Sequence, residues 1–278
     1  LSLLYYIKIL GFLTYLLISF YDSDGPFLPT DLEGVSFDDP TMINRFKNLM
    51  DWVIPMLAEY DGFAIAISNE ADNIFADLPD LPGQLLTFLN ESKTHIKSLD
   101  DRIAVTITFA EGSLKSNFPG TDALIAACDV ASFNFYGAES GFESPFKRTL
   151  TPAEIRSDIQ QMLQVAGDKP ILIQELGMHT GSDVLASNEE IQRQFFEVFF
   201  TEMQKEERIR AAYVFQLVDW SPTLTASFIQ PLEGSGVPQE FIDGFAESLN
   251  TIGLINYSDG QRKAAWGEFV KWVEEFRE

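Results

Sequence analysis

Two apolar segments of the chain end in acidic residues that are suited to acid–base chemistry. The run FAIAISN (63–69) leads directly into Glu70, so the amide of Asn69 and the carboxyl group of Glu70 stand side by side. The segment PILIQE (170–175) has the same design and ends in Glu175. Two carboxyl groups facing each other can cleave a glycosidic bond, one as proton donor and the other as nucleophile or base. We therefore expect Glu70 and Glu175 to face each other across a common pocket, about 5–5.5 Å apart if the reaction retains configuration.

The elements that must position these residues are short apolar runs separated by helical patterns. The runs are nearly continuous rather than alternating, which is typical of parallel strands covered on both faces. The chain contains neither an internal linker nor a low-complexity segment, so the alternation predicts one α/β domain over residues 1–278. Six runs are expected to form strands, at residues 13–21, 63–69, 103–109, 130–136, 170–175 and 211–220.

Helix signals fill the intervals between the runs. Thr151 with Glu154 predicts a capping box at the start of a helix that Gly167 ends. Ser187 with Glu190 predicts a second capping box of the same kind. Further helices are expected at residues 2–10, 41–60 (with a kink at Pro55), 81–99 and 261–278.

Polar residues favour a barrel over an open doubly wound sheet. No G-x-G-x-x-G turn follows any run, which argues against a dinucleotide-binding open sheet. Polar and aromatic side chains instead gather at the carboxyl ends of the runs, where a β/α barrel places its catalytic groups. We predict a (β/α)8 TIM barrel that is N-terminally truncated, with strands three to eight visible; an open or irregular partial barrel is the alternative. The gathered residues are Asp22, Asn69, Glu70, Glu111, Asn134, Tyr136, Glu175, Asp219 and Trp220.

The two acidic segments also carry a resemblance to a known group of enzymes. ISNEAD and ILIQELG resemble the acid/base and nucleophile segments of the retaining glycoside hydrolases of clan A, the cellulase, mannanase and galactanase type of barrel. The resemblance implies that Glu70 is the acid/base and Glu175 the nucleophile, and that Asn69 contacts the 2-hydroxyl of the sugar. FNFYG resembles the segment with the tyrosine that orients the nucleophile, which implies this role for Tyr136. VDWSP implies that Trp220 is the aromatic floor of the subsite nearest the cleaved bond.

The resemblance extends over residues 60–270, and the sequence departs from the clan pattern after the acid/base, in lacking a strand-two arginine that contacts the nucleophile, and in having Tyr21 and Asp22 where the cellulase group has a strand-three histidine. The segment FAESLNTIGLINYSDGQRKAAWGEF resembles the last barrel segments of bacterial members of the clan. Members of the clan usually have proline after the acid/base, whereas Ala71 and Asp72 follow Glu70 here.

Three further residues are predicted to bind or orient the substrate, and plainer explanations stay open beside them. Asn134 precedes the orienting tyrosine on the same run, His179 follows Glu175 by four residues, and Asp22 follows the first run. His179 is equally well explained as an exposed loop residue. A carboxyl group at a helix start is favoured by the helix dipole, which would make Glu70 or Glu175 structural.

Composition narrows the classes of function. A net charge of −23 over 278 residues repels a phosphate backbone, so no nucleic-acid partner is expected. One cysteine and two histidines leave no set of zinc ligands, and neither a cofactor nor a metal is expected. Residues 1–20 are long enough to cross a bilayer, but Lys8 and Gly11 interrupt them, so no membrane insertion is expected.

Three functions follow from these residues. The main hypothesis is a retaining hydrolase that cleaves β-glycosidic bonds in an oligo- or polysaccharide, and such a substrate favours a secreted or periplasmic location. A second is a non-catalytic carbohydrate-binding barrel. A third is a metal-dependent barrel enzyme that holds Mg²⁺ through Asp22, Glu70, Glu111 and Glu175.

Overall fold

The computed structural model describes the chain except for residues 1, 23–24, 117, 140–147 and 277–278. Contacts divide it into two compact units. The first comprises Leu1–Asn134 and Leu163–Leu172, and the second comprises Phe135–Met162 and Ile173–Glu278. The boundary crosses strands β6 (Ala131–Tyr136) and β7 (Ile171–Gly177), so each unit receives part of both strands.

The strands form one six-stranded sheet in the order β1-β4-β5-β6-β7-β8. The pairs β1–β4, β4–β5 and β5–β6 are parallel. Neighbouring strands follow one another along the chain, without the reversal of order that defines a doubly wound sheet. The prediction of an α/β fold with six strands is confirmed. The remaining strands of this sheet are β1 (Thr14–Leu17), β4 (Gly62–Asn69), β5 (Ala104–Ala110) and β8 (Ile209–Val214).

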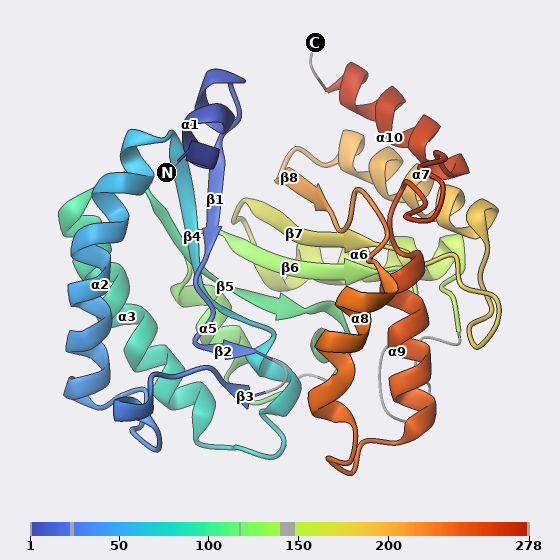
Figure 1. The fold of residues 1–278 in the computed structure, drawn as a ribbon. Coiled ribbons are helices and arrows are strands. Elements are labelled where there is room, and N and C mark those ends of the chain that lie inside the picture. Colours follow the sequence, from blue (N-terminus) through green and yellow to red (C-terminus); the bar gives the residue numbers. More distant parts are fainter. Residues whose placement is uncertain (1, 23–24, 117, 140–147, 277–278) are drawn as a thin grey trace. The chain divides into compact units, whose positions relative to one another are not determined.

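In the first unit, α2 (Pro40–Glu59) and α3 (Leu81–Leu99) lie side by side and pack beside the sheet (Figure 1). Apolar residues recur on one face of α2, and two of them, Met50 and Ile54, are fully buried. The rings of Phe46 and Phe88 pack at 5.0 Å between the two helices. The predicted helix 41–60 therefore forms and continues through Pro55. The unit also contains α1 (Ser2–Ile9), η1 (Thr30–Leu32), η2 (Ala71–Ile74), α4 (Glu111–Ser116) and α5 (Thr121–Ala127).

The first predicted strand, 13–21, was too long. β1 ends at Leu17, and Phe20 already pairs outside this sheet, because its carbonyl accepts the backbone N–H of Phe27 at 2.8 Å. Beyond β1 the chain forms a separate antiparallel ribbon of β2 (Tyr21–Asp22) and β3 (Gly25–Pro26). An apolar run alone does not reveal where a strand leaves its sheet.

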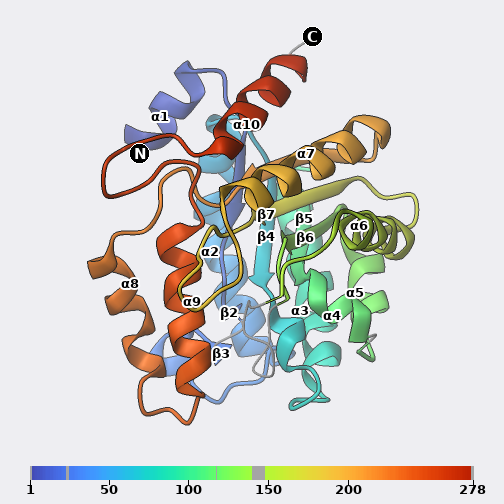
Figure 2. The ribbon, with the colours of Figure 1, turned by 90° about the vertical axis from the view of Figure 1, so that its right-hand side faces the viewer.

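In the second unit, α10 (Ala264–Glu275) packs along α7 (Glu189–Lys205), and α8 (Pro222–Ile229) lies beside α9 (Gln239–Thr251) (Figure 2). The ring of Phe135 on β6 packs against Phe195 and Phe199 of α7, at 5.5 and 6.0 Å. This contact buries the apolar face of α7 against the sheet. The unit also contains η3 (Gln230–Leu232) and the larger part of α6 (Pro152–Ala166).

One of the two predicted capping boxes forms. At the start of α6, the N–H of Thr151 donates to Glu154 Oε2 at 2.8 Å, and the N–H of Glu154 donates to Thr151 Oγ1 at 3.3 Å. The prediction at α7 was wrong: Asn188 caps this helix by accepting from the N–H groups of residues 190 and 191. The hydroxyl of Ser187 is engaged elsewhere, because it donates to the carbonyl of His179 at 2.8 Å.

Candidate active site

Glu70 directly follows β4 and has an unusual backbone conformation. Its N–H donates to the carbonyl of Thr108 on β5 at 2.9 Å, so the strand pairing extends to this residue. Its φ of 48° and ψ of 23° lie in the left-handed region, which residues other than glycine avoid. Holding such a residue there costs on the order of 1–3 kcal/mol, and strain of this kind is concentrated at functional sites.

Asn134 on β6 holds the side chains at the end of β4. Its Nδ2 donates to Asn69 Oδ1 at 3.1 Å and to Glu70 Oε1 at 2.8 Å. The second carboxyl oxygen of Glu70 lies 3.5 Å from Nδ2 of Asn73. Asn69 and Asn134 are both buried, whereas Glu70 is half-buried. The structure thus joins three of the residues predicted from sequence, Asn69, Glu70 and Asn134, in one hydrogen-bonded group.

Asp72 is a buried carboxyl group close to Glu70 in the chain. It is 1% exposed, and its Oδ2 accepts the N–H of Ala110 at 3.1 Å. Burial raises the pKa of Asp72 from 3.8 to about 7, and the backbone hydrogen bond to Ala110 opposes this only in part. Asp72, one of the two residues that depart from the clan pattern, is therefore protonated below pH 7 and about half ionised near pH 7.

Glu175 lies within β7, between β6 and β8. The hydroxyl of Tyr136 donates to Glu175 Oε2. Phe215 directly follows β8, and its ring centroid lies 6.1 Å from that of Tyr136, with the two ring planes at 88°. Gly177 permits this approach, because a Cβ at that position would lie 2.9 Å from the Tyr136 ring and 2.7 Å from the carbonyl oxygen of Phe215. Phe215 is thus an aromatic neighbour of the Tyr136–Glu175 pair that the sequence reasoning missed.

Trp220, the predicted aromatic floor, lies on the segment after β8. Its backbone N–H donates to the carbonyl of Leu249 on α9, and its ring packs edge-on against Phe228 of α8 at 5.2 Å. The ring that meets Tyr136 at 6.1 Å belongs to Phe215, and the floor role of Trp220 stays a prediction. An aromatic residue directly after a strand-like run was a signal available in the sequence, but the predicted strand 211–220 extended past it.

The residue before Trp220 forms a buried ion pair. Nζ of Lys263 lies 2.7 Å from Asp219 Oδ1, and the same oxygen accepts the N–H of Gly253 at 2.7 Å. The side chains of Lys263 and Asp219 are 2% and 6% exposed. Burial raises the pKa of Asp219 and lowers that of Lys263, because it penalises both charged forms. This pair fixes the loop after β8 to the segment that precedes α10.

Two other predicted site residues have less defined roles. His179 is 3% exposed, so it is not the exposed loop residue of the plainer explanation, and its carbonyl accepts from Ser187. Asp22 lies in β2, but its side chain is outside the described part of the structure. The substrate contacts proposed for both residues stay predictions, as does the pairing of Glu70 with Glu175.

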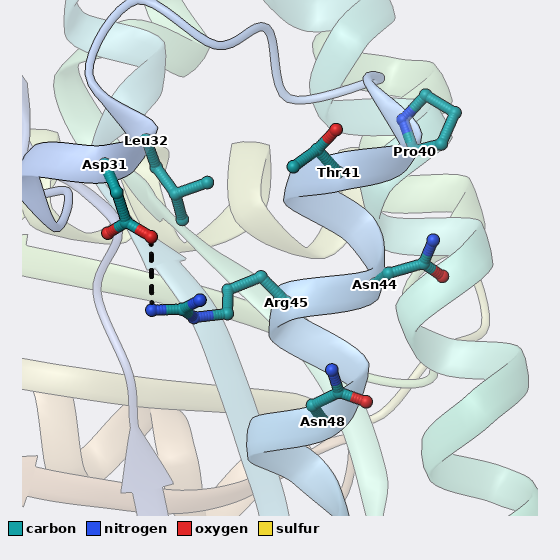
Figure 3. Close-up of a pocket in the computed structure, with 7 residues that line it drawn as sticks. All are labelled: Asp31, Leu32, Pro40, Thr41, Asn44, Arg45 and Asn48. Carbon is teal, nitrogen blue, oxygen red and sulfur yellow. Dashed lines mark ion pairs between the residues drawn. The ribbon is translucent and has the colours of Figure 1, made fainter.

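Two surface depressions in the first unit contain none of the predicted residues. The first, of about 440 Å³, lies at η1 and the first turns of α2, where Arg45 pairs with Asp31 at 3.2 Å (Figure 3). The second, of about 520 Å³, is lined by the end of α5 and by residues 165–170. Among the described residues, no cluster of three or more His, Cys, Asp or Glu could hold a metal ion. No helix of the described part combines the length and apolar character needed to cross a membrane.

Comparisons with known proteins give similarity in fold. No protein-family model matches the sequence, and no curated protein matches it. The GH53 catalytic domain of Ignisphaera aggregans matches with a TM-score of 0.66 and 16% identity, over 96% of this chain and 76% of that chain.

Two longer enzymes match as well. β-Glucuronidase 2 of Bacteroides uniformis, covalently bound to cyclophellitol-6-carboxylate aziridine, matches with a TM-score of 0.64 and 14% identity, over 99% of this chain. The GH2 β-galacturonidase of Eisenbergiella tayi, bound to galacturonate, matches with a TM-score of 0.62 and 16% identity, over 98% of this chain. This chain spans 30% and 42% of the lengths of these two proteins. At such identities the chain shares an α/β fold with domains of glycoside hydrolases.

Proposed function

We propose that this chain is a glycoside hydrolase that cleaves β-glycosidic bonds with retention of configuration, with Glu70 as acid/base and Glu175 as nucleophile. One observation carries the proposal: each carboxyl group lies at or near the end of a strand and accepts a hydrogen bond from a neutral donor on β6. Asn134 donates to Glu70, and Tyr136 donates to Glu175. The fold shared with glycosidase domains supports the same reaction class.

The proposed reaction has two steps that balance in protons. In the first, a carboxylate oxygen of Glu175 attacks the anomeric carbon, and Glu70 gives its proton to the leaving oxygen as the glycosidic bond breaks. In the second, Glu70 takes a proton from water, whose oxygen attacks the same carbon and releases Glu175. The net reaction consumes one water molecule, and both residues return to their starting protonation.

The neighbouring groups fit these roles. A hydroxyl donor such as that of Tyr136 favours the ionised form of Glu175 that the attack requires. The amide of Asn134 orients Glu70 and Asn69 together, and Asn69 is proposed to contact the 2-hydroxyl of the sugar. Trp220 is proposed as the aromatic floor of the subsite nearest the cleaved bond. His179 and Asp22 are proposed as outer contacts of the substrate.

We further infer that the six strands are strands three to eight of an eight-stranded barrel. The order of the strands follows the chain, as it does around a barrel. Within the described residues, β1 pairs with β4 alone and leaves its other edge open. An open edge of a parallel sheet is where preceding β/α units would pair.

Azide rescue tests the proposed roles on an aryl β-glycoside with a good leaving group. Glu175→Ala should lose at least about 1,000-fold in kcat, and azide should restore turnover with an α-glycosyl azide as product. Glu70→Ala with azide should give the β-glycosyl azide, because the covalent intermediate still forms. Glu207→Ala, which removes an exposed glutamate before β8, is the matched control.

The outcomes separate the candidate functions. Wild-type turnover that survives Glu175→Ala would reject the assignment of the nucleophile. Glycan binding by calorimetry without any turnover would instead favour a carbohydrate-binding barrel.

A further inference from the structure

The connection between β7 and α7 is held by a carboxylate from a distant helix. Glu247 on α9 accepts three successive backbone N–H groups of this connection, at residues 183, 184 and 185. The distances are 2.8 Å from the N–H of Asp183 to Oε1, and 2.7 and 2.9 Å from those of Val184 and Leu185 to Oε2. Both oxygens of the carboxylate are therefore used, and the three donors converge on one side chain.

The rest of the connection is built around this contact. The N–H of Ser187 donates to the carbonyl of Gly181 at 2.9 Å, which closes a loop over residues 181–187. A Cβ at Gly181 would lie 2.7 Å from Cδ and Cγ of Glu247, so the glycine makes room for the carboxylate. Leu185 is buried at the base of the loop. The three hydrogen bonds to this carboxylate thus hold the loop together.

A carboxylate suits this position better than its amide counterpart. It offers acceptor sites only, and hydrogen bonds from N–H groups to a charged acceptor are stronger than those to a neutral one. Glutamine has the same shape, but its NH₂ group would face backbone N–H donors, so at least one of the three hydrogen bonds would be lost.

We propose that Glu247 is a positioning residue for the substrate site: it holds the 181–187 loop in the conformation in which the loop contacts the sugar chain beyond the cleaved bond. The proposal rests on the proposed function. The connection that contains this loop leaves β7 after Gly177, two residues beyond Glu175, and in β/α folds the loops at this end of the strands bind the substrate. Glu247 itself need not touch the substrate.

Amide hydrogen exchange tests the contact without any substrate. In Glu247→Gln, the amides of residues 183–185 should exchange at least about tenfold faster than in the wild type. Asp243→Asn, which removes an exposed carboxylate from the same helix, should leave them unchanged. Gly181→Ala perturbs the same contact from the loop side and should produce the same acceleration. Equal exchange rates of these amides in the wild type, in Glu247→Gln and in Gly181→Ala would overturn the proposal.

Steady-state kinetics on an oligosaccharide then separates positioning from mere stability. Glu247→Gln and Gly181→Ala should each raise KM about tenfold and leave kcat within about threefold. The double variant should show no more than the larger single effect, because both changes break one contact. Faster exchange with unchanged KM would reduce Glu247 to a structural role and reject the proposal. Absence of turnover in the wild type would reject the proposed function. The exchange experiment would still show whether Glu247 holds the amides of residues 183–185.

Discussion

Replacing Asp72 by asparagine should change how stability depends on pH. Asp72 is 1% exposed, and burial raises its pKa from 3.8 to about 7. In the unfolded chain the group ionises near pH 4, whereas in the folded chain it keeps its proton until about pH 7. The unfolded state therefore loses the proton first as the pH rises, which favours unfolding.

The size of the effect follows from the two pKa values. They differ by about 3 pH units, and each unit is worth 1.36 kcal/mol, so Asp72 lowers the free energy of unfolding by about 4 kcal/mol above pH 7. The loss begins near pH 4 and levels off above pH 7. An asparagine at this position carries no ionisable group, and its side-chain oxygen can still accept the N–H of Ala110. Asp72→Asn should therefore be close to the wild type at pH 4 and more stable by about 2–4 kcal/mol at pH 8.

Urea unfolding from pH 4 to pH 9 measures this difference directly. Subtracting the wild-type curve from the Asp72→Asn curve cancels the contributions of the other acidic residues. Asp77→Asn, at an exposed position five residues further along, controls for the removal of one negative charge. A difference between Asp72→Asn and the wild type that stays constant over the whole range would refute the reasoning.

Two further substitutions probe the second unit. Tyr136→Phe removes the donor to Glu175, so kcat/KM should fall about 10–100-fold and the acid limb of its pH profile should move to higher pH; an unchanged profile would dissociate the tyrosine from the nucleophile. Lys263→Met leaves Asp219 buried without its cation, so the free energy of unfolding should fall by about 3–5 kcal/mol in urea titration at pH 7. Lys271→Met, which removes an exposed lysine, is the control for that loss, and equal stability of the two variants would show that the buried pair contributes nothing.

Those parts of the fold that depend on local patterns could be predicted from the sequence. All six apolar runs became strands, four of them within two residues of their expected bounds, because parallel strands buried on both faces leave a continuous apolar signal. The Thr151–Glu154 box formed because both partners lie within one turn. α8 and α9 were missed, although Ser221, which caps α8 by accepting the N–H of Leu224, was a signal available in the sequence.

Features that depend on distant partners could not be predicted. Ser187 looked like a helix cap, but its hydroxyl binds the carbonyl of His179, and Asn188 takes the cap instead. The carboxylate of Glu247 meets the 183–185 amides across more than 60 residues of sequence, and nothing local marks it. Burial of Asp72 is equally invisible, because an acidic residue in a short turn resembles a hydrated one.

The residues of the candidate site could also be predicted from the sequence only in part. Asn69, Glu70 and Asn134 were each chosen for their place at a strand end, and strand pairing brings them together. Their shared amide contact depends on the register of β4, β5 and β6, which the sequence does not encode locally. Phe215 was hidden for a similar reason, because β8 ends before it rather than after Trp220.

The left-handed backbone at Glu70 has a consequence for attempts to make the protein more heat-resistant. Glycine adopts this conformation freely and asparagine does so more readily than glutamate, so either residue would relax the turn. A library selected only for survival at high temperature would therefore drift toward variants that no longer carry the carboxyl group. A screen for folding would favour glycine or asparagine at this position, whereas a screen for turnover would retain glutamate.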